Sequence, residues 1–199
     1  MPSYTISPDE VVKQARVVAV VGASKNPEKE AYTVPLYLME NGFVVIPINP
    51  SANSIFGVRT FPTLADLPDE VAKRVEVVDV FRPSDDLADV SRQVVFMKGR
   101  TGKVAVFWAQ LGLQSAAAEK ILKENSVPYV MDVCIRTQHM DYSRRNPKSG
   151  PRTNAEWHQK NPMPKNPTNR ERVEWHLEHA KNCGCRPIPA SVSADLASL

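Results

Sequence analysis

Several features are scarce in this chain of 199 residues, and each absence excludes a class of protein. No apolar run approaches the ~20 residues that a membrane-spanning helix needs, so we expect no membrane partner. No secretory signal is present, which favours a cytoplasmic protein. Only three cysteines occur, an odd number that does not indicate a disulfide framework.

Glycine-rich phosphate motifs are also missing. The sequence contains no G-x-x-x-x-G-K-[ST] loop. The apolar run 17–21 ends in Gly22, but the further glycines of a G-x-G-x-x-G dinucleotide motif do not follow. The next apolar run ends in Asn49 instead of the acidic residue that would hold a ribose. These absences disfavour NAD(P) binding, which we keep as an alternative.

Charge is divided unevenly along the chain. Residues 1–142 carry 15 Lys and Arg against 17 Asp and Glu, a net charge of −2. Residues 143–199 carry 10 against 5, a net charge of +5. Because acidic residues are interspersed through the basic tail, we expect a solvated surface there and no nucleic-acid partner.

A valine-rich run followed by a tight turn is the strongest local signal. Four valines and one alanine at 17–21 precede Gly22, which is typical of a strand buried on both faces. Glycine lets the backbone turn sharply and lets a ligand approach closely. Ser24 and Lys25 add a hydroxyl group and a cation, and a predicted helix follows. Free N–H groups at the start of that helix would attract phosphate, so the stretch predicts a phosphate-bearing ligand.

Apolar runs alternate with helical segments, which is the pattern of βαβ units and a parallel sheet. We expect a doubly wound five-stranded α/β sheet in the order 3-2-1-4-5, with a crevice at the carboxyl ends of the strands where the order reverses. A helix is predicted over about 32–41, with Pro35 in its first turn. The expected strands are 17–21, 43–48, 75–81, 104–108 and 128–133.

Residues 143–199 differ in composition from the rest of the chain. Prolines are frequent in the first half of this segment, and a helix is predicted over 170–182 with Thr168 or Asn169 as its N-cap. We therefore divide the chain into a domain at 1–142 and a basic, proline-rich, partly helical extension. The extension is a candidate surface for a protein partner. Homodimer formation is kept as a further possibility.

Linked motifs occur in order within residues 5–142. They are Gly22-Ala-Ser-x-x-Pro27, Tyr32-x-Val-Pro-x-Tyr37-Leu, Gly42-Phe-x-Val-Ile-Pro-Ile-Asn49-Pro50, Ile55-x-Gly57, Asp79-Val-Phe81-Arg82-Pro83, Trp108-x-Gln110-x-Gly112, and Met131-Asp132-x-Cys134 with His139. The series resembles the stand-alone coenzyme A-binding proteins with a Rossmann-like fold. That family is related to the coenzyme A-binding domains of succinyl-CoA synthetase and of ADP-forming acyl-CoA synthetases.

The resemblance implies a coenzyme A site along one edge of the sheet. It places the pyrophosphate or ribose near the turn after the first strand and the adenosine beside the end of the second. The cofactor-binding residues that it implies are Gly22, Ala23, Ser24, Lys25, Asn49, Pro50, Phe81, Arg82, Trp108, Ala109 and Gln110. Arg82 can contact a phosphate with two N–H groups, Lys25 acts as a point charge, and Arg59 is a further cation. Val133 stands where relatives often carry arginine.

Catalytic groups are also conceivable at the strand ends. Cys134 could attack a thioester or form a mixed disulfide with coenzyme A, with His139 as its base. Asp79 and Asp132 could exchange protons. Buried cysteines and loop-stabilising carboxylates are the commoner case, so we predict no catalytic residue and keep an enzyme using Cys134 as the alternative.

The tail carries a group of metal-ligand residue types. His176, His179 and Cys183 fall on one helical face, and Cys185 could close a tetrahedral site. The spacing does not match a standard zinc signature, so we predict no metal and keep a zinc-dependent tail as an alternative. For the whole chain we expect a protein that binds coenzyme A or an acyl-CoA without catalysis of its own.

Overall fold

The valine-rich runs form the centre of the molecule. The computed structural model describes residues 2–147 and 153–199, so that residues 148–152 of the predicted extension lie outside the described residues. All residues of β2 (Val17–Val21), β3 (Val44–Ile48) and β6 (Val77–Val80) are buried. Burial on both faces explains why these strands are continuous apolar runs without alternation.

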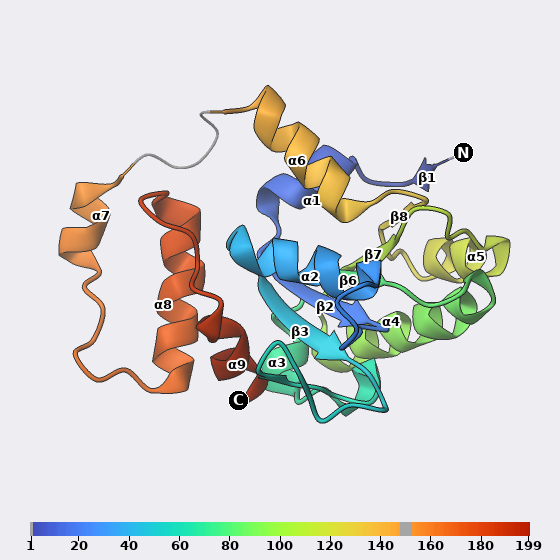
Figure 1. Ribbon diagram of the computed structural model, residues 1–199, viewed down its shortest axis with the longest axis horizontal. Helices are drawn as coiled ribbons and strands as arrows, with labels where there is room; N and C mark the ends of the chain where they lie inside the picture. Colours follow the sequence, from blue (N-terminus) through green and yellow to red (C-terminus); the bar gives the residue numbers. More distant parts are fainter. Residues whose placement is uncertain (1, 148–152) are drawn as a thin grey trace.

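Parallel pairing joins these three strands to two more (Figure 1). The expected α/β fold with five parallel strands is thereby confirmed, and an antiparallel edge strand next to β8 adds to it. A small antiparallel hairpin forms a separate two-stranded sheet and contacts β3. The remaining strands are β1 (Ser3–Tyr4), β7 (Val106–Ala109) and β8 (Tyr129–Met131) in the sheet, and β4 (Ser54–Ile55) and β5 (Val58–Arg59) in the hairpin.

The strand order differs from the expected 3-2-1-4-5. The observed order is β1-β8-β7-β6-β2-β3, so the third predicted strand, β6, lies between the first and the fourth. Among the parallel strands this is the order 2-1-3-4-5, the other common doubly wound arrangement. The order reverses between β2 and β6, and the crevice moves with it to the ends of these two strands.

Pro47 explains why β3 is at the edge. The Pro47 carbonyl accepts a hydrogen bond from Phe61 N–H at 3.2 Å, on the side of β3 that faces away from β2. The carbonyl and the N–H of one strand residue point to the same side, so the N–H that proline lacks would also point outward. Proline is tolerated at an edge and not between two partner strands, which excludes the expected central position.

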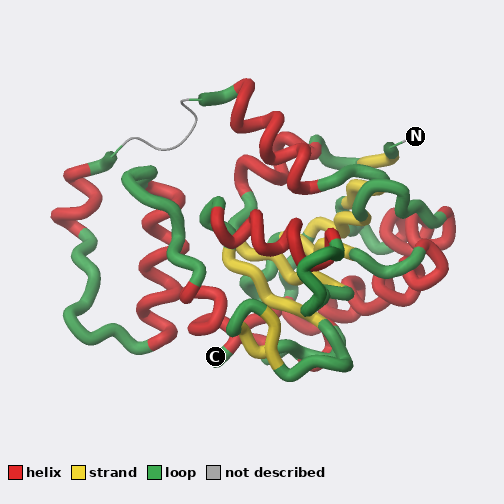
Figure 2. Tube along the Cα trace, viewed as in Figure 1, coloured by secondary structure: helices red, strands yellow, loops and turns green. Residues whose placement is uncertain are grey.

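Helices cover both faces of the sheet (Figure 2). One layer contains α1 (Pro8–Gln14), α2 (Glu30–Glu40) and α6 (Ile135–Arg145). The opposite layer contains α3 (Asp69–Ala72), α4 (Leu87–Thr101) and α5 (Ala116–Glu124), with short 3-10 turns at Leu64–Asp66 and Ser84–Asp86. In the described part of the chain, no helix is both long enough and apolar enough to cross a bilayer.

Helix α2 begins earlier than predicted, and this changes the position of Pro35. With Glu30 as the first helical residue, Pro35 lies in the interior of the helix and not in its first turn. A proline there leaves the carbonyl four residues earlier without its usual partner. That carbonyl, of Ala31, accepts a hydrogen bond from Ser24 N–H at 3.0 Å instead. The proline is therefore accommodated by the turn that follows β2.

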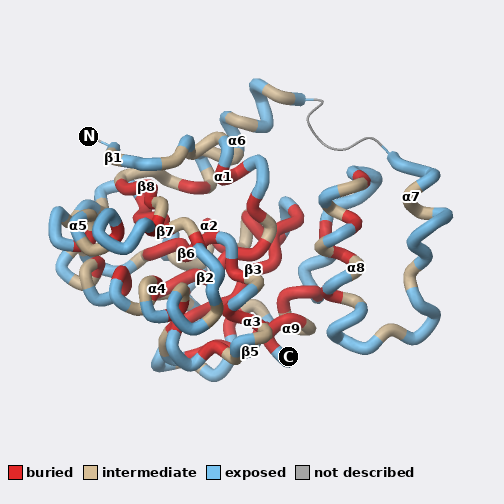
Figure 3. Tube along the Cα trace, turned by 180° about the vertical axis from the view of Figure 1, so that it is seen from behind, coloured by how far each residue is buried: buried red, intermediate tan, exposed pale blue. Residues whose placement is uncertain are grey.

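In its described residues the extension adds three helices, of which only α8 was expected. They are α7 (Ala155–Lys160), α8 (Asn169–Asn182) and α9 (Ser191–Ala197). Thr168 caps α8, as predicted, and its side chain accepts a hydrogen bond from Glu171 N–H. Helix α9 packs against β3, whereas α7 lies outermost and is largely exposed (Figure 3).

A buried hydrogen bond fixes α9 to the edge of the sheet. Ser193 Oγ accepts from Val45 N–H at 2.9 Å, and both residues are fully buried. Val45 N–H belongs to the strand edge that β2 does not pair, so the serine replaces a partner strand.

Replacing Ser193 with alanine tests this attachment. The Ser193→Ala variant leaves a buried N–H without an acceptor, which we expect to lower the free energy of unfolding by about 1–3 kcal/mol. Urea denaturation of both proteins measures the change. Ser143→Ala, at an exposed serine of α6, is the control and should stay within about 0.5 kcal/mol. Equal losses in the two variants would contradict the role given to Ser193.

Candidate functional site

The turn after β2 brings two strands into close contact. Gly22 has φ +86°, a conformation that side chains disfavour. A Cβ atom at this position would lie 3.2 Å from Arg82 Cδ and 3.4 Å from the backbone of Phe81. Gly22 N–H also donates to Ile48 O at 3.0 Å. The glycine thus lets the ends of β2, β3 and β6 meet at one point.

The following residues form a compact loop with amides directed to several partners. Asn26 N–H donates to Ser24 Oγ at 3.0 Å, and Lys29 N–H donates to Asn26 O at 3.1 Å. The N–H groups of Ala23 and Lys25 make no hydrogen bond to the described part of the chain. Unpaired backbone donors in such a turn are suited to a phosphate group.

Two adjoining cavities open at this turn, and both are lined by Gly22, Asn49 and Arg82. One has a volume of about 420 Å³ and extends over the loop, where Ala23, Ser24, Lys25 and Phe81 line it. The other has a volume of about 390 Å³ and extends toward α4, where Pro50, Asp86, Asp89 and Gln93 are among its lining residues. Eight of the residues expected at a cofactor site thus surround one pair of cavities.

The cavities lie where the strand order reverses. Gly22 follows β2 and Arg82 follows β6, and these are the strands on either side of the reversal. Open α/β sheets bind their ligands at this kind of switch point, outside the carboxyl ends of the strands. The first and third of the predicted strands, β2 and β6, therefore border the candidate site. The expected order 3-2-1-4-5 would have placed it between the first and the fourth strands.

Charges of both signs surround the cavities. Lys25 and Lys29 line the cavity over the loop, and both side chains are exposed. Arg82 lies between the two cavities, with Nη2 2.7 Å from Asp86 Oδ2 and Nε 3.0 Å from the same oxygen. The arginine is about half exposed, so this ion pair is weak and its guanidinium can turn toward an anion.

Asn49 joins the end of β3 to the turn. Its Nδ2 group donates to Ala23 O at 2.7 Å, and its Oδ1 atom accepts from Ser51 N–H at 2.7 Å. The side chain therefore holds the loop in place. Ser51 lines both cavities and Lys29 lines one of them, and no separate motif in the sequence pointed to either residue.

Three expected site residues lie deeper than the cavities. Trp108, Ala109 and Gln110 are buried and line neither of them. Trp108 Nε1 donates to Val133 O at 2.7 Å, so the indole braces the end of β8. A direct contact of these three residues with a cofactor stays a prediction.

Gln110 instead pairs with a buried acid below the switch point. Its Nε2 group donates to Asp79 Oδ1 at 2.6 Å, while Asp79 Oδ2 and Gln110 Oε1 make no hydrogen bond within the described residues. Burial raises the pKa of Asp79 to about 7, against the opposing effects of the Gln110 amide and the Val80 backbone. A protonated Asp79 can donate to Gln110 Oε1, which would satisfy both remaining atoms.

The structure does not bring the suggested catalytic pair together. Cys134 caps α6 and lines a cavity with Leu111 and Asp132, on the outer side of β8. His139 Nδ1 lies 2.8 Å from the Tyr37 hydroxyl, in a different cavity. Burial lowers the pKa of His139, and the charge of Arg16 lowers it further. The geometry gives Cys134 no histidine base.

A comparison with protein families matches the part of the chain that forms the parallel sheet. The family model described as "CoA binding domain" matches residues 16–140. The uncharacterized protein YneT of Bacillus subtilis is 31% identical over 130 residues, which cover 65% of this chain and 90% of that protein. The ADP-forming acetate–CoA ligase II of Archaeoglobus fulgidus is 30% identical over 105 residues, 52% of this chain but only 15% of that enzyme.

A solved structure has the same fold. The Thermus thermophilus protein is 34% identical, with a TM-score of 0.60, and the match covers 69% of this chain and 99% of that one. The family match ends at residue 140 and does not include the extension.

Substitution of Gly22 tests the close contact at the turn. The positive φ and the contact with Arg82 predict that Gly22→Ala lowers the free energy of unfolding by about 1–2 kcal/mol or more. Gly99→Ala is a matched control, because Gly99 lies in α4 with open space at its Cβ position. We expect this control to raise stability by up to about 1 kcal/mol. Thermal unfolding of both variants gives the comparison, and destabilisation of both would contradict the assignment.

Titration of stability tests the buried Asp79. Its pKa is raised from 3.8 to about 7, so between these pH values the folded chain keeps a proton that the unfolded chain has lost. The contribution of Asp79 to the free energy of unfolding is therefore fully present below about pH 4 and declines as the pH rises to about 7. The Asp79→Asn variant does not titrate here, so its stability relative to the parent should rise over that range. Urea midpoints at several pH values measure this, with the exposed Asp85→Asn as the control. A stability difference between Asp79→Asn and the parent that did not change with pH would exclude the raised pKa of Asp79.

Proposed function

The chain belongs to the CoA-binding domain family, and from this premise we propose that it binds coenzyme A, free or as an acyl-CoA, in the paired cavities at the ends of β2, β3 and β6. The pyrophosphate lies over the turn at Gly22 to Lys25, and the rest of the nucleotide extends past Asn49. The observation that carries the proposal is the pair of cavities that meet at the strand-order reversal.

The chemistry of the lining residues supports an anionic ligand. Coenzyme A carries several phosphate charges, and Lys25, Lys29 and Arg82 surround the loop cavity. The unpaired N–H groups of Ala23 and Lys25 supply donors that do not depend on side-chain conformation. Asp86 and Asp89 line only the second cavity, which favours the less charged part of the ligand there.

The proposal is limited to binding. The chain matches a small part of the Archaeoglobus ligase, so the reaction of that enzyme is not transferred to it. Cys134 has no histidine base, and no other group at the cavities forms a nucleophile–base pair within the described residues. We therefore infer a carrier, sensor or partner subunit for coenzyme A that does no chemistry of its own.

NAD(P) is the competing ligand. A dinucleotide site would place an acidic side chain near the end of β3 to bind a ribose. Asn49 occupies that strand end, and its amide is already bonded to Ala23 and Ser51. This arrangement favours coenzyme A over NAD(P).

Isothermal titration calorimetry of the full chain tests the proposal. Coenzyme A should bind, and Lys25→Ala and Arg82→Ala should each weaken binding about 10-fold or more, the loss of a charge-assisted contact of about 1.5–3 kcal/mol. Lys120→Ala removes an equal charge at an exposed position of α5 and should leave the affinity unchanged. No heat at millimolar coenzyme A, or tighter binding of NAD, would refute the proposed function.

A further inference from the structure

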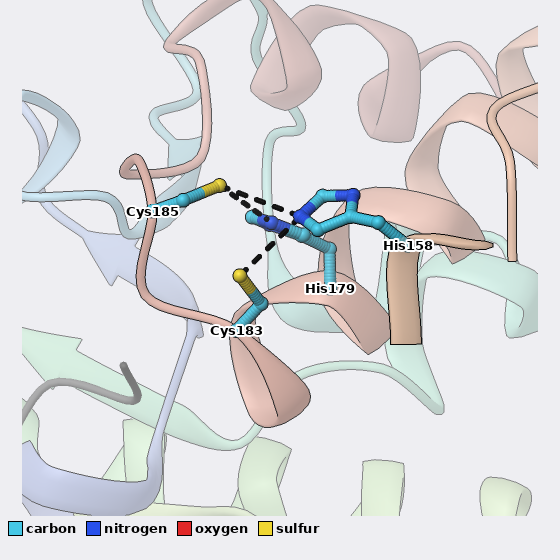
Figure 4. A group of neighbouring side chains, drawn as sticks. All are labelled: His158, His179, Cys183 and Cys185. Carbon is cyan, nitrogen blue, oxygen red and sulfur yellow. Dashed lines mark hydrogen bonds between the residues drawn. The ribbon is translucent and has the colours of Figure 1, made fainter. Parts of the chain in front are cut away.

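Four metal-ligand side chains converge in the extension, away from the proposed coenzyme A site. His158 comes from α7, His179 from α8, and Cys183 and Cys185 from the segment after α8 (Figure 4). One ligand atom of each lies within 4.8 Å of all the others. The chain has four histidines and three cysteines, so half of the histidines and two of the cysteines meet at this point.

The distances match those around a single tetrahedral ion. His179 Nε2 lies 3.2 Å from Cys185 Sγ, and His158 Nε2 lies 3.3 Å from Cys183 Sγ and 3.6 Å from Cys185 Sγ. Zinc bonds of about 2.3 Å to sulfur and about 2.0 Å to nitrogen place neighbouring ligand atoms about 3.3–3.8 Å apart. These three separations are close to that range, and no two ligand atoms of the group lie more than 4.8 Å apart, so the four can converge on one zinc ion.

The set of ligands differs from the one that the sequence pattern suggested. His176 is not part of the group, and His158 takes its place from a separate helix. His179 and Cys183 are four residues apart, and Cys183, at the end of α8, donates its backbone N–H to His179 O at 2.7 Å. The last helical turn therefore puts the two residues on the same face. The segment between α7 and α8 brings His158 to this face, which a search for short ligand spacings does not detect.

Surrounding contacts hold the group in position. Asn154 caps α7, and its backbone N–H donates to Cys183 Sγ at 3.3 Å, a contact that favours a thiolate. The Trp175 ring stacks on His179 with centroids 4.9 Å apart, and Trp157 packs against both. Trp175 Nε1 also donates to Asn161 O at 2.9 Å. The two tryptophans thus shield one side of the group from water.

We propose that His158, His179, Cys183 and Cys185 bind a structural zinc ion that fastens α7 to α8. Two thiolates and two imidazoles form the Cys₂His₂ donor set of closed zinc sites. All four positions come from the protein, so none is open for a substrate and the site is structural. Helix α7 is short and exposed, and the ion supplies the attachment that its small apolar surface does not.

Metal analysis of the full chain tests the proposal. Protein purified without chelators, from cells supplied with zinc, should contain about one zinc ion per chain. His158→Gln, Cys183→Ser and Cys185→Ser should each reduce the zinc content severalfold. Cys134→Ser and His176→Gln change the remaining cysteine and a neighbouring histidine, and both should keep full zinc content. Absence of zinc from the parent, or equal loss in ligand and control variants, would overturn the proposal.

Cobalt substitution identifies the ligands independently of protein stability. Chelator-treated protein given Co²⁺ should show the visible absorption of a tetrahedral ion together with thiolate-to-cobalt charge transfer. The charge-transfer band should disappear in the Cys183→Ser, Cys185→Ser double variant and persist in Cys134→Ser. A cobalt spectrum without thiolate-to-cobalt charge transfer, in protein kept reduced after chelation, would contradict the site. Coenzyme A titration of the zinc-free protein keeps this result separate from the proposed function.

Discussion

The close approach of β2 and β6 at Gly22 is the constraint on which the rest of the structure depends. A glycine without a side chain lets Arg82 and the Phe81 backbone lie against the turn. The same contact places the ends of β2, β3 and β6 around two cavities. Two amides of the loop stay without a partner among residues 2–147 and 153–199. Fold and candidate site therefore have a common physical origin, since a Cβ atom at Gly22 would press on Arg82 and the Phe81 backbone and would be strained by the positive φ.

A second constraint acts at the edge strand. Pro47 removes a donor from the outer side of β3, Phe61 pairs with its carbonyl, and Ser193 accepts from Val45 N–H. Together they occupy the edge that would otherwise be open to another strand. The extension is thus joined to the sheet by a strand-edge contact as well as by the buried apolar residues of α9.

The sequence was sufficient for the fold class and for most of the candidate site, and insufficient for the topology. Buried valine runs separated by helices predict a parallel sheet whatever its order, because local patterns do not record which strands pair. Pro47 held the missing information, since a proline indicates an edge. Pro35 misled for a related reason: its effect on α2 is offset by Ser24, a partner outside the helix. His158 could not be grouped with Cys183 until the chain between them was folded.

The charged residues of the extension also have a structural role, because several of them form ion pairs that position α8. Arg170 and Arg172, in the first turn of α8, pair with Glu70 in α3 and with Asp195 in α9. Glu174 of α8 pairs with Arg74. Exposed pairs contribute little stability singly, but they specify where a helix with few apolar residues lies. Apolar burial of α9 and the ion pairs of α8 therefore act on the inner part of the extension. Neither reaches α7, which contacts α8 through the packing of Trp157 on Trp175 and through the gathered histidines and cysteines. A zinc ion at the proposed site would add metal–ligand bonds to these contacts and so fix the outermost of the described helices.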